Sequence, residues 1–163
     1  METIAIIGGG ASGLMAAVEA SLALRQAGAA AHVALFEADP ERIGRSILAT
    51  GNGRCNISNA CISADAYRNH AFVEEALMHL QSGYAVERGA ACARTLEANP
   101  VLERFADMGL VTREESEGRL YPMANKATSV LDVLRSTSAE LGVDVQTDKR
   151  ALRVDAPAPG GAG

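Results

Sequence analysis

A run of glycines near the N-terminus, Gly8-Gly9-Gly10-Ala11-Ser12-Gly13, fits the pattern G-x-G-x-x-G. Gly8 permits a tight turn out of a strand, Gly10 lets a pyrophosphate approach the backbone, and Gly13 lets a helix pack close to a sheet. The N–H groups at the start of that helix, together with its dipole, favour a diphosphate. The pattern predicts a dinucleotide site whose binding residues are Gly8, Gly10, Ala11, Ser12 and Gly13.

An acid follows this turn at the expected interval, because Glu37 lies 24 residues after Gly13. Its carboxylate can accept hydrogen bonds from ribose hydroxyl groups, and it would repel a 2′-phosphate, which disfavours NADP at this site. The alternative is a glycine turn without a ligand, followed by an exposed acid at the end of a strand.

The elements needed to position these residues are present on both sides of the turn. Thr3–Ile7 is a short apolar run that predicts a buried parallel strand, and His32–Phe36 predicts a second strand. Between them, Ala11–Gln26 has apolar residues at helical spacing, and Gly28 is a helix stop. A strand, helix and strand in this order form a right-handed βαβ unit. We therefore predict an α/β fold with a parallel sheet, that is, a Rossmann-like dinucleotide-binding domain.

The later part of the chain predicts further elements at Ala71–Leu80, Glu97–Met108, Leu110–Glu114, Thr128–Leu141, Val143–Thr147 and Ala151–Asp155. Helix stops stand at Gly109 and Gly142, and Pro100 suits the first turn of its helix better than the interior. We predict one domain over 1–155 with a helical insertion at about 66–127. Residues 156–163 read as a turn or tail.

A polar, glycine-rich loop follows a short helical turn at 47–49. It offers six candidate cofactor-binding residues, Gly51, Asn52, Gly53, Arg54, Cys55 and Asn56. Such a loop can lay main-chain N–H groups along the edge of a flavin, whose partners tune its potential. Arg54 can stabilise an anionic reduced flavin or bind a substrate carboxylate, and Cys55 suits a packing or flavin-contact role. The alternative is a structural loop whose Asn side chains satisfy its own turns.

The pair Gly44-Arg45 resembles the pattern of many FAD-binding reductases and oxidases, in which the arginine can reach phosphate. The longer stretch 44–59, GRSILATGNGRCNISN, resembles the signature of the BaiN/aminoacetone oxidase-like family of NAD(P)/FAD-dependent oxidoreductases. A second stretch, 118–130, resembles that family's G-R-x-F/Y-P segment leading into a helix. Ser46 and Ala124 depart from the family pattern, which usually has Lys and Ser there.

The resemblance implies a bound FAD, a reduced nicotinamide, NAD(P)H, as electron donor, and a small-molecule substrate. Oxidation with oxygen as acceptor is a related possibility. It also implies a second domain and a C-terminal remainder of the same protein that completes the FAD site. No catalytic acid or base can be identified. Two other hypotheses remain: an NAD-dependent Rossmann dehydrogenase, and a truncated fragment that keeps the nucleotide cradle without activity.

Composition limits the other classes. The 163-residue chain has a net charge of −5, so no basic footprint indicates nucleic acid, and no apolar stretch is long enough for a membrane span. Three cysteines without metal-ligand spacing, Cys55, Cys61 and Cys92, indicate free thiols in the cytoplasm. Scattered histidines predict no metal site. We interpret the acidic residues at 114, 115 and 117 as a solvated turn, while Tyr121 suits either a ligand contact or the core.

Overall fold

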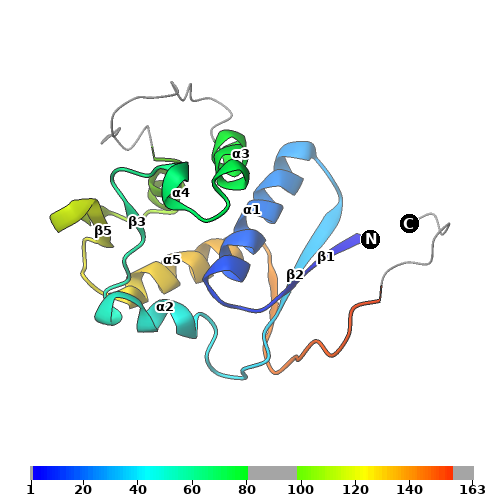
Figure 1. Ribbon diagram of the computed structural model, residues 1–163. Helices are drawn as coiled ribbons and strands as arrows, with labels where there is room; N and C mark the ends of the chain where they lie inside the picture. Colours follow the sequence, from blue (N-terminus) through cyan, green and yellow to red (C-terminus); the bar gives the residue numbers. More distant parts are fainter. Residues whose placement is uncertain (1, 81–98, 156–163) are drawn as a thin grey trace. The chain divides into compact units, whose positions relative to one another are not determined.

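The structure is a computed structural model that describes residues 2–80 and 99–155, and its chain divides into two compact units (Figure 1). Unit 1 consists of Met1–Ser46 and Leu134–Gly163, and unit 2 consists of Ile47–Val133. The predicted tail at 156–163 lies outside the described residues. The predicted boundaries, 1–155 with an insertion at about 66–127, stay predictions.

Unit 1 contains a parallel sheet of three strands in the order β1-β2-β6. The strands are β1 (Glu2–Ile7), β2 (Ala31–Phe36) and β6 (Asp144–Gln146). Ile6 pairs with Leu35, and Leu35 pairs with Val145 across the sheet. The predicted βαβ unit with parallel strands is therefore confirmed.

Helix α1 (Ala11–Ala27) connects β1 to β2 and buries one face, formed by the apolar Leu14, Ala17 and Val18 together with Ser21. It ends at Gly28, which takes the left-handed conformation at φ 60° that the prediction of a glycine stop requires. The C-terminal part of α5 (Ala127–Glu140), from Leu134 onward, also belongs to unit 1. Arg25 Nη2 of α1 donates to the main-chain oxygen of Glu140 at 2.9 Å.

Strand β1 differs from its prediction, since it was expected to be buried and is mostly exposed. Ile4 is 40% exposed and Ile7 is 57% exposed. Within the described residues β1 pairs with β2 alone, so it lies at the edge of the sheet. An apolar run indicates a β-strand but does not indicate how many strands lie beside it.

Unit 2 is built around an antiparallel sheet of three short strands in the order β3-β5-β4. These strands are β3 (Ser58–Asn59), β4 (Thr112–Glu114) and β5 (Arg119–Pro122). The helices are α2 (Arg45–Ala49), which begins in unit 1, α3 (His70–Leu80) and α4 (Pro100–Asp107), with 3-10 turns η1 (Thr50–Gly53), η2 (Ala64–Ala66) and η4 (Ser116–Gly118).

Asn99 links helix α4 to the sheet of unit 2. Its side-chain oxygen accepts from the N–H of Leu102, which caps the helix, and its amide nitrogen donates to the main-chain oxygen of Asn59 at 2.9 Å. The side chain is buried, so both of its hydrogen-bonding ends must be satisfied within the protein. Pro100 occupies the first turn of α4, as the sequence predicted.

One further prediction is wrong. Residues 151–155 form no strand, and Leu152 and Val154 are 89% and 85% exposed. The helix predicted at Ala71–Leu80 is observed, but Phe72 on its apolar face is 70% exposed. In both places the apolar residues of the sequence stay mostly exposed.

The close approach of α1 to the glycine turn gives a stability prediction. A β-carbon added at Gly13 would lie 1.8 Å from the main-chain oxygen of Gly8, whereas one added at Gly10 would meet only the Ser46 hydroxyl at 3.4 Å. We expect Gly13→Ala to lower the free energy of unfolding by about 1–3 kcal/mol, despite the better helix propensity of Ala.

Gly10→Ala is the matched control, with an expected loss of less than about 1 kcal/mol at a helix N-cap. Urea unfolding at equal m-values measures both changes. A Gly13→Ala variant as stable as the Gly10→Ala variant would show that the close approach is absent.

Candidate functional site

The glycine turn and the strand-end acid are joined directly. The main-chain N–H of Gly9 donates to Glu37 Oε2 at 2.6 Å, and the N–H of Asp39 donates to Glu37 Oε1 at 2.8 Å. Glu37 therefore lies against the turn that joins β1 to α1, and the alternative of a freely exposed strand-end acid does not describe it. A carboxylate has about four lone-pair sites, so two donors leave room for ribose hydroxyl groups.

These hydrogen bonds also hold Glu37 in its ionised form. The N–H groups of Asp39 and Gly9 lower the pKa of the Glu37 carboxyl below its ordinary value of 4.5, and they outweigh the opposing effect of burial. The acid is therefore a full negative charge at neutral pH. A negative charge at this place favours hydroxyl donors and disfavours a phosphate group.

Gly9, which occupies a variable position of the G-x-G-x-x-G pattern, is a residue that the sequence analysis missed. A β-carbon there would lie 2.7 Å from a side-chain carbon of Ile43 and 3.1 Å from Glu37 Oε2. Its main-chain oxygen accepts from the N–H of Gly44 at 2.7 Å, and this bond joins the loop at 37–44 (the 40s loop) to the turn. The run of three consecutive glycines was the only signal for this role.

The start of α1 is open on its N-terminal side. Its N-cap residue is Gly10, which has no side chain to cap the N–H groups of the first turn. Ser46 lies close by, since a β-carbon on Gly10 would be 3.4 Å from its hydroxyl oxygen. In the sequence, Ser46 stands out only as a departure from a family pattern. Its neighbour Arg45 is exposed at the start of α2.

The polar loop in unit 2 turns sharply through left-handed backbone conformations. Gly51, Asn52, Gly53 and Cys55 all have positive φ values, at 55°, 54°, 78° and 59°. The N–H groups of Arg54 and Cys55 donate back to the main-chain oxygens of Gly51 and Thr50 at 3.1 Å each. These two N–H groups therefore serve the loop itself, whereas the exposed side chains of Asn52 and Asn56 face solvent.

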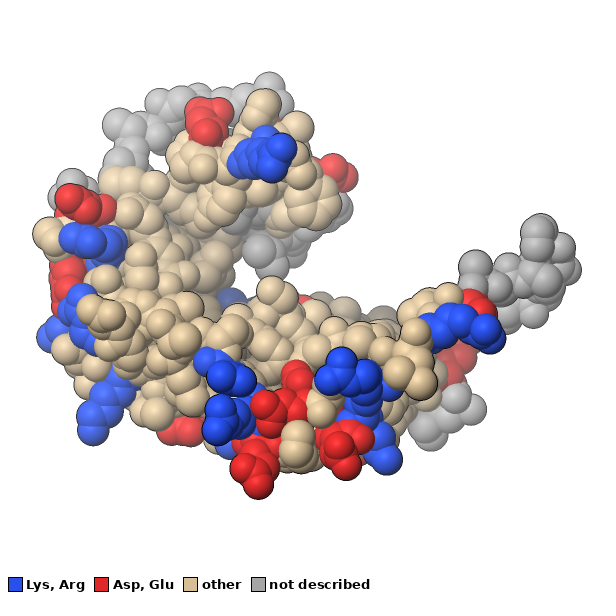
Figure 2. All heavy atoms as spheres, turned by 60° about the horizontal axis from the view of Figure 1, so that its bottom comes forward, with Lys and Arg blue, Asp and Glu red and all other residues tan. Residues whose placement is uncertain are grey.

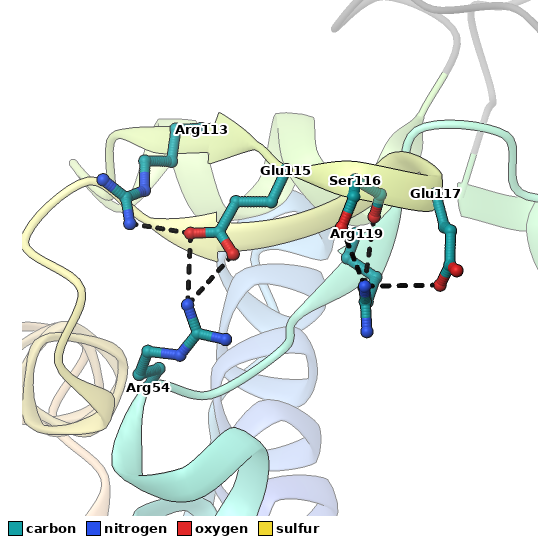
Figure 3. Close-up of polar contacts among 6 residues, drawn as sticks. All are labelled: Arg54, Arg113, Glu115, Ser116, Glu117 and Arg119. Atoms are coloured by element: carbon teal, nitrogen blue, oxygen red, sulfur yellow. Dashed lines mark hydrogen bonds and ion pairs between the residues drawn. The ribbon is translucent and has the colours of Figure 1, made fainter.

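Arg54 is the charged residue of the loop at 51–56, and several contacts hold its side chain. Its Nη1 donates to both carboxylate oxygens of Glu115, at 3.2 and 3.0 Å, and Arg113 Nη2 donates to Glu115 Oε1 at 2.7 Å (Figure 3). The guanidinium carbon of Arg54 also lies 4.3 Å from the centroid of the Tyr121 ring. This arrangement combines ion pairing with a cation–π contact.

Glu115 corrects the prediction of a solvated acidic turn. Its side chain is 27% exposed and is held between Arg54 and Arg113. Partial burial raises the pKa of the Glu115 carboxyl, but the hydrogen bonds and charges of Arg54 and Arg113 outweigh it, so the pKa lies below its ordinary value. Glu117, in contrast, is exposed and pairs with Arg119 at 3.3 Å.

Tyr121 is buried under this cluster, with 4% of its surface exposed. Of the two readings left open by the sequence, the structure therefore favours the core aromatic, whose face carries Arg54. A β-carbon on Gly51 would lie 3.3 Å from its ring, which explains a small residue there.

The cysteines only partly match their prediction. Cys55 is free and buried, whereas Cys61 is disulfide-bonded, so free thiols are confirmed for Cys55 and wrong for Cys61. Cys92 lies outside the described residues. Over 2–80 and 99–155, no group of three or more His, Cys, Asp or Glu residues is placed to hold a metal ion.

The surface and the helices bear on possible partners. On the face drawn in Figure 2, basic and acidic side chains are interspersed, and the described residues there form no broad patch of one sign. Within the described part of the chain, no helix is both long and apolar enough to cross a membrane. The predictions of no nucleic acid and no membrane partner stay predictions.

The predicted site residues fall into two sets. Gly8, Gly10, Ala11, Ser12, Gly13, Glu37 and Arg45 belong to unit 1, where hydrogen bonds join the turn, the acid and the 40s loop. Gly51, Asn52, Gly53, Arg54, Cys55 and Asn56 belong to unit 2, around Glu115 and Tyr121. Each set lies within its own unit.

A parallel sheet, a glycine turn after its first strand and an acid after its second define a Rossmann-type nucleotide-binding domain. The chain belongs to the HI0933-like protein Rossmann domain family, whose model matches residues 2–160. The predicted fold class and the predicted family are thereby confirmed.

Proteins similar to the chain include a reductase and a Diels-Alderase. The 3-dehydro-bile acid delta(4,6)-reductase of Clostridium scindens is 36% identical over 160 residues, which cover 96% of this chain and 34% of the reductase. The chain thus spans about a third of that relative's length. The Diels-Alderase PyrE3 of pyrroindomycin biosynthesis aligns over 97% of this chain and 28% of its own at 18% identity, with a TM-score of 0.43 that establishes no further likeness.

The lowered pKa of Glu37 predicts a pH dependence of stability. A carboxyl group whose pKa is depressed by folding stabilises the native state above its unfolded pKa, near 4.5, and loses that contribution as the pH falls through its folded pKa. We expect the free energy of unfolding to fall more between about pH 6 and about pH 3 in the wild type than in Glu37→Gln.

Urea unfolding of both proteins across this pH range measures the difference. The Glu37→Gln variant keeps a smaller pH dependence of its own, because Glu115 also has a lowered pKa. Parallel curves for the two proteins would mean that the Glu37 carboxylate is not held by the turn.

Proposed function

We propose that the chain is the dinucleotide-binding part of an FAD-dependent oxidoreductase. The observation that carries the proposal is the hydrogen bond from the Gly9 N–H to Glu37, because it holds the proposed ribose-binding acid beside the turn. In this proposal the diphosphate lies at the open start of α1, where Gly10 provides space and the uncapped N–H groups provide donors. Glu37 accepts hydrogen bonds from the adenosine ribose.

The choice of FAD over NAD is supported by the family and by the second set of residues. Arg45 is exposed at the start of α2, beside the Ser46 hydroxyl that lies near Gly10, and can reach a phosphate group. The loop at 51–56 supplies exposed amide side chains and a fixed cation for the flavin or the substrate. When bound, flavin supplies hydride and electron transfer, while the protein residues orient it and exclude water.

The whole protein's reaction is proposed by analogy with the relative. A reductase that is 36% identical to the chain supports reduction of a small organic substrate, with a reduced nicotinamide as electron donor. We further propose that a C-terminal remainder completes the FAD site. A cytoplasmic location belongs to the same proposal, although the disulfide at Cys61 removes one reason for it.

Cofactor content tests the proposal directly. The purified chain is examined for visible flavin absorbance, and any bound cofactor is released and identified; the apo chain is then titrated with FAD and with NAD. We expect FAD to bind in preference to NAD. Binding of NAD with exclusion of FAD would favour the Rossmann dehydrogenase, and binding of neither would favour the fragment that keeps the cradle without a cofactor.

The geometry of the turn makes a sharper prediction for FAD binding. Gly10→Ala places a methyl group where the diphosphate would approach, so we expect FAD affinity to fall about tenfold or more. The same variant should retain its stability, because nothing but the Ser46 hydroxyl lies within reach. Isothermal titration measures the affinity, and unchanged affinity in the folded variant would place the diphosphate elsewhere.

A further inference from the structure

The cluster around Arg54 has hydrogen-bond donors that the protein does not use. Arg54 reaches Glu115 through Nη1, and the edge formed by its Nε and Nη2 has no hydrogen-bond partner among the described residues. Arg113 likewise has a buried Nε without a hydrogen-bond partner in the described part of the chain. The Nε and Nη2 edge of a guanidinium group is a two-donor fork that matches the two oxygens of a carboxylate.

The orientation of this fork is fixed by three contacts. The ring of Tyr121 supports the guanidinium plane from one face at 4.3 Å. Glu115 holds the opposite terminal nitrogen, and Arg113 in turn holds Glu115 at 2.7 Å. Figure 3 shows Arg54 and Arg113 reaching the Glu115 carboxylate from different sides. A fork held in this way loses less conformational freedom when it binds an anion.

The charges of the cluster leave one positive charge over. Two guanidinium groups face a single carboxylate. Of the other acids nearby on the chain, Glu117 is paired with Arg119 and Glu114 is exposed. The Arg54 side chain remains 37% exposed, so part of it can be reached from solvent. A surface ion pair alone adds little stability. Stability is therefore a weak reason for holding Arg54, Arg113 and Glu115 together.

We propose that Arg54 receives the carboxylate of an organic substrate, and that Glu115 and Arg113 are the residues that position Arg54 for it. The inference rests on the proposed function only for naming the ligand as a substrate. Glu115 repels an incoming anion by its charge, so its positive contribution comes entirely from orienting Arg54. Loss of the Glu115 charge should therefore weaken anion binding if Glu115 orients Arg54, and strengthen it if only the charge matters.

The test uses benzoate as the probe and benzamide as its neutral control. Binding to the purified chain is followed by NMR at the Nε–H signals of arginine, with Arg54→Lys identifying the Arg54 signal. We expect the Arg54 signal to shift saturably with benzoate and not with benzamide. Failure of the Arg54 signal to move in the wild type would overturn the proposal without any variant.

Glu115→Gln separates the two mechanisms. It removes a negative charge while keeping the side chain's size, so simple electrostatics predicts tighter benzoate binding, and positioning predicts weaker binding by about fivefold or more. Glu117→Gln is the matched control, since it removes the same charge from a neighbouring exposed residue that does not touch Arg54. Equal or tighter binding in Glu115→Gln, with the fold intact by circular dichroism, would overturn the positioning role.

This experiment is independent of the flavin titration. A chain that binds benzoate at Arg54 but takes up no FAD keeps the carboxylate site and loses the proposed flavin function. A chain that binds FAD but does not bind benzoate keeps the flavin function and loses the carboxylate site.

Discussion

The carboxylate of Glu37 accepts hydrogen bonds from two main-chain N–H groups, and the geometry of unit 1 around the turn depends on them. The bond to Gly9 joins the end of β2 to the turn after β1, and the bond from Gly44 to Gly9 brings the 40s loop to the same point. Gly9 has no room for a side chain there, and Gly13 has no room against Gly8. Gly9 and Gly13 are therefore required by packing before any ligand is considered, whereas Gly10 has room for a β-carbon and is the position that a ligand would restrict.

Two carboxylates in this chain are held in opposite ways, and the difference bears on what each can do. Glu37 is held by neutral N–H donors, so it keeps its negative charge and spare lone pairs for hydroxyl groups of a ligand. Glu115 is held by two cations, so its charge is more than neutralised, and what it leaves open is a donor edge on Arg54. The first suits a ribose and the second suits an anion. Each arrangement lies within one unit.

The sequence predicted those parts of the structure that local physics determines. The turn, α1, β2 and the acid depend on glycine conformation, on helical and strand periodicity and on a short connection, and all are observed. The partners of Arg54 were not predictable in this way, because Glu115 lies 61 residues away in the sequence and reaches Arg54 only through the sheet of unit 2. The exposure of Phe72 and Leu152 was not predictable for a related reason, since periodicity indicates an apolar face but not what covers it.

The central claim is that the turn at Gly8–Gly13 and Glu37 form one nucleotide cradle, and the most direct test is to locate the ligand on the main chain. Amide signals of the isotope-labelled chain are recorded during a titration with FAD. The account predicts that the largest saturable shifts belong to Gly9, Ser12, Gly13 and Asp39, whose N–H groups lie at the start of α1 or bind Glu37. A spectrum in which FAD leaves these amides unmoved, whether or not it shifts others, would contradict it.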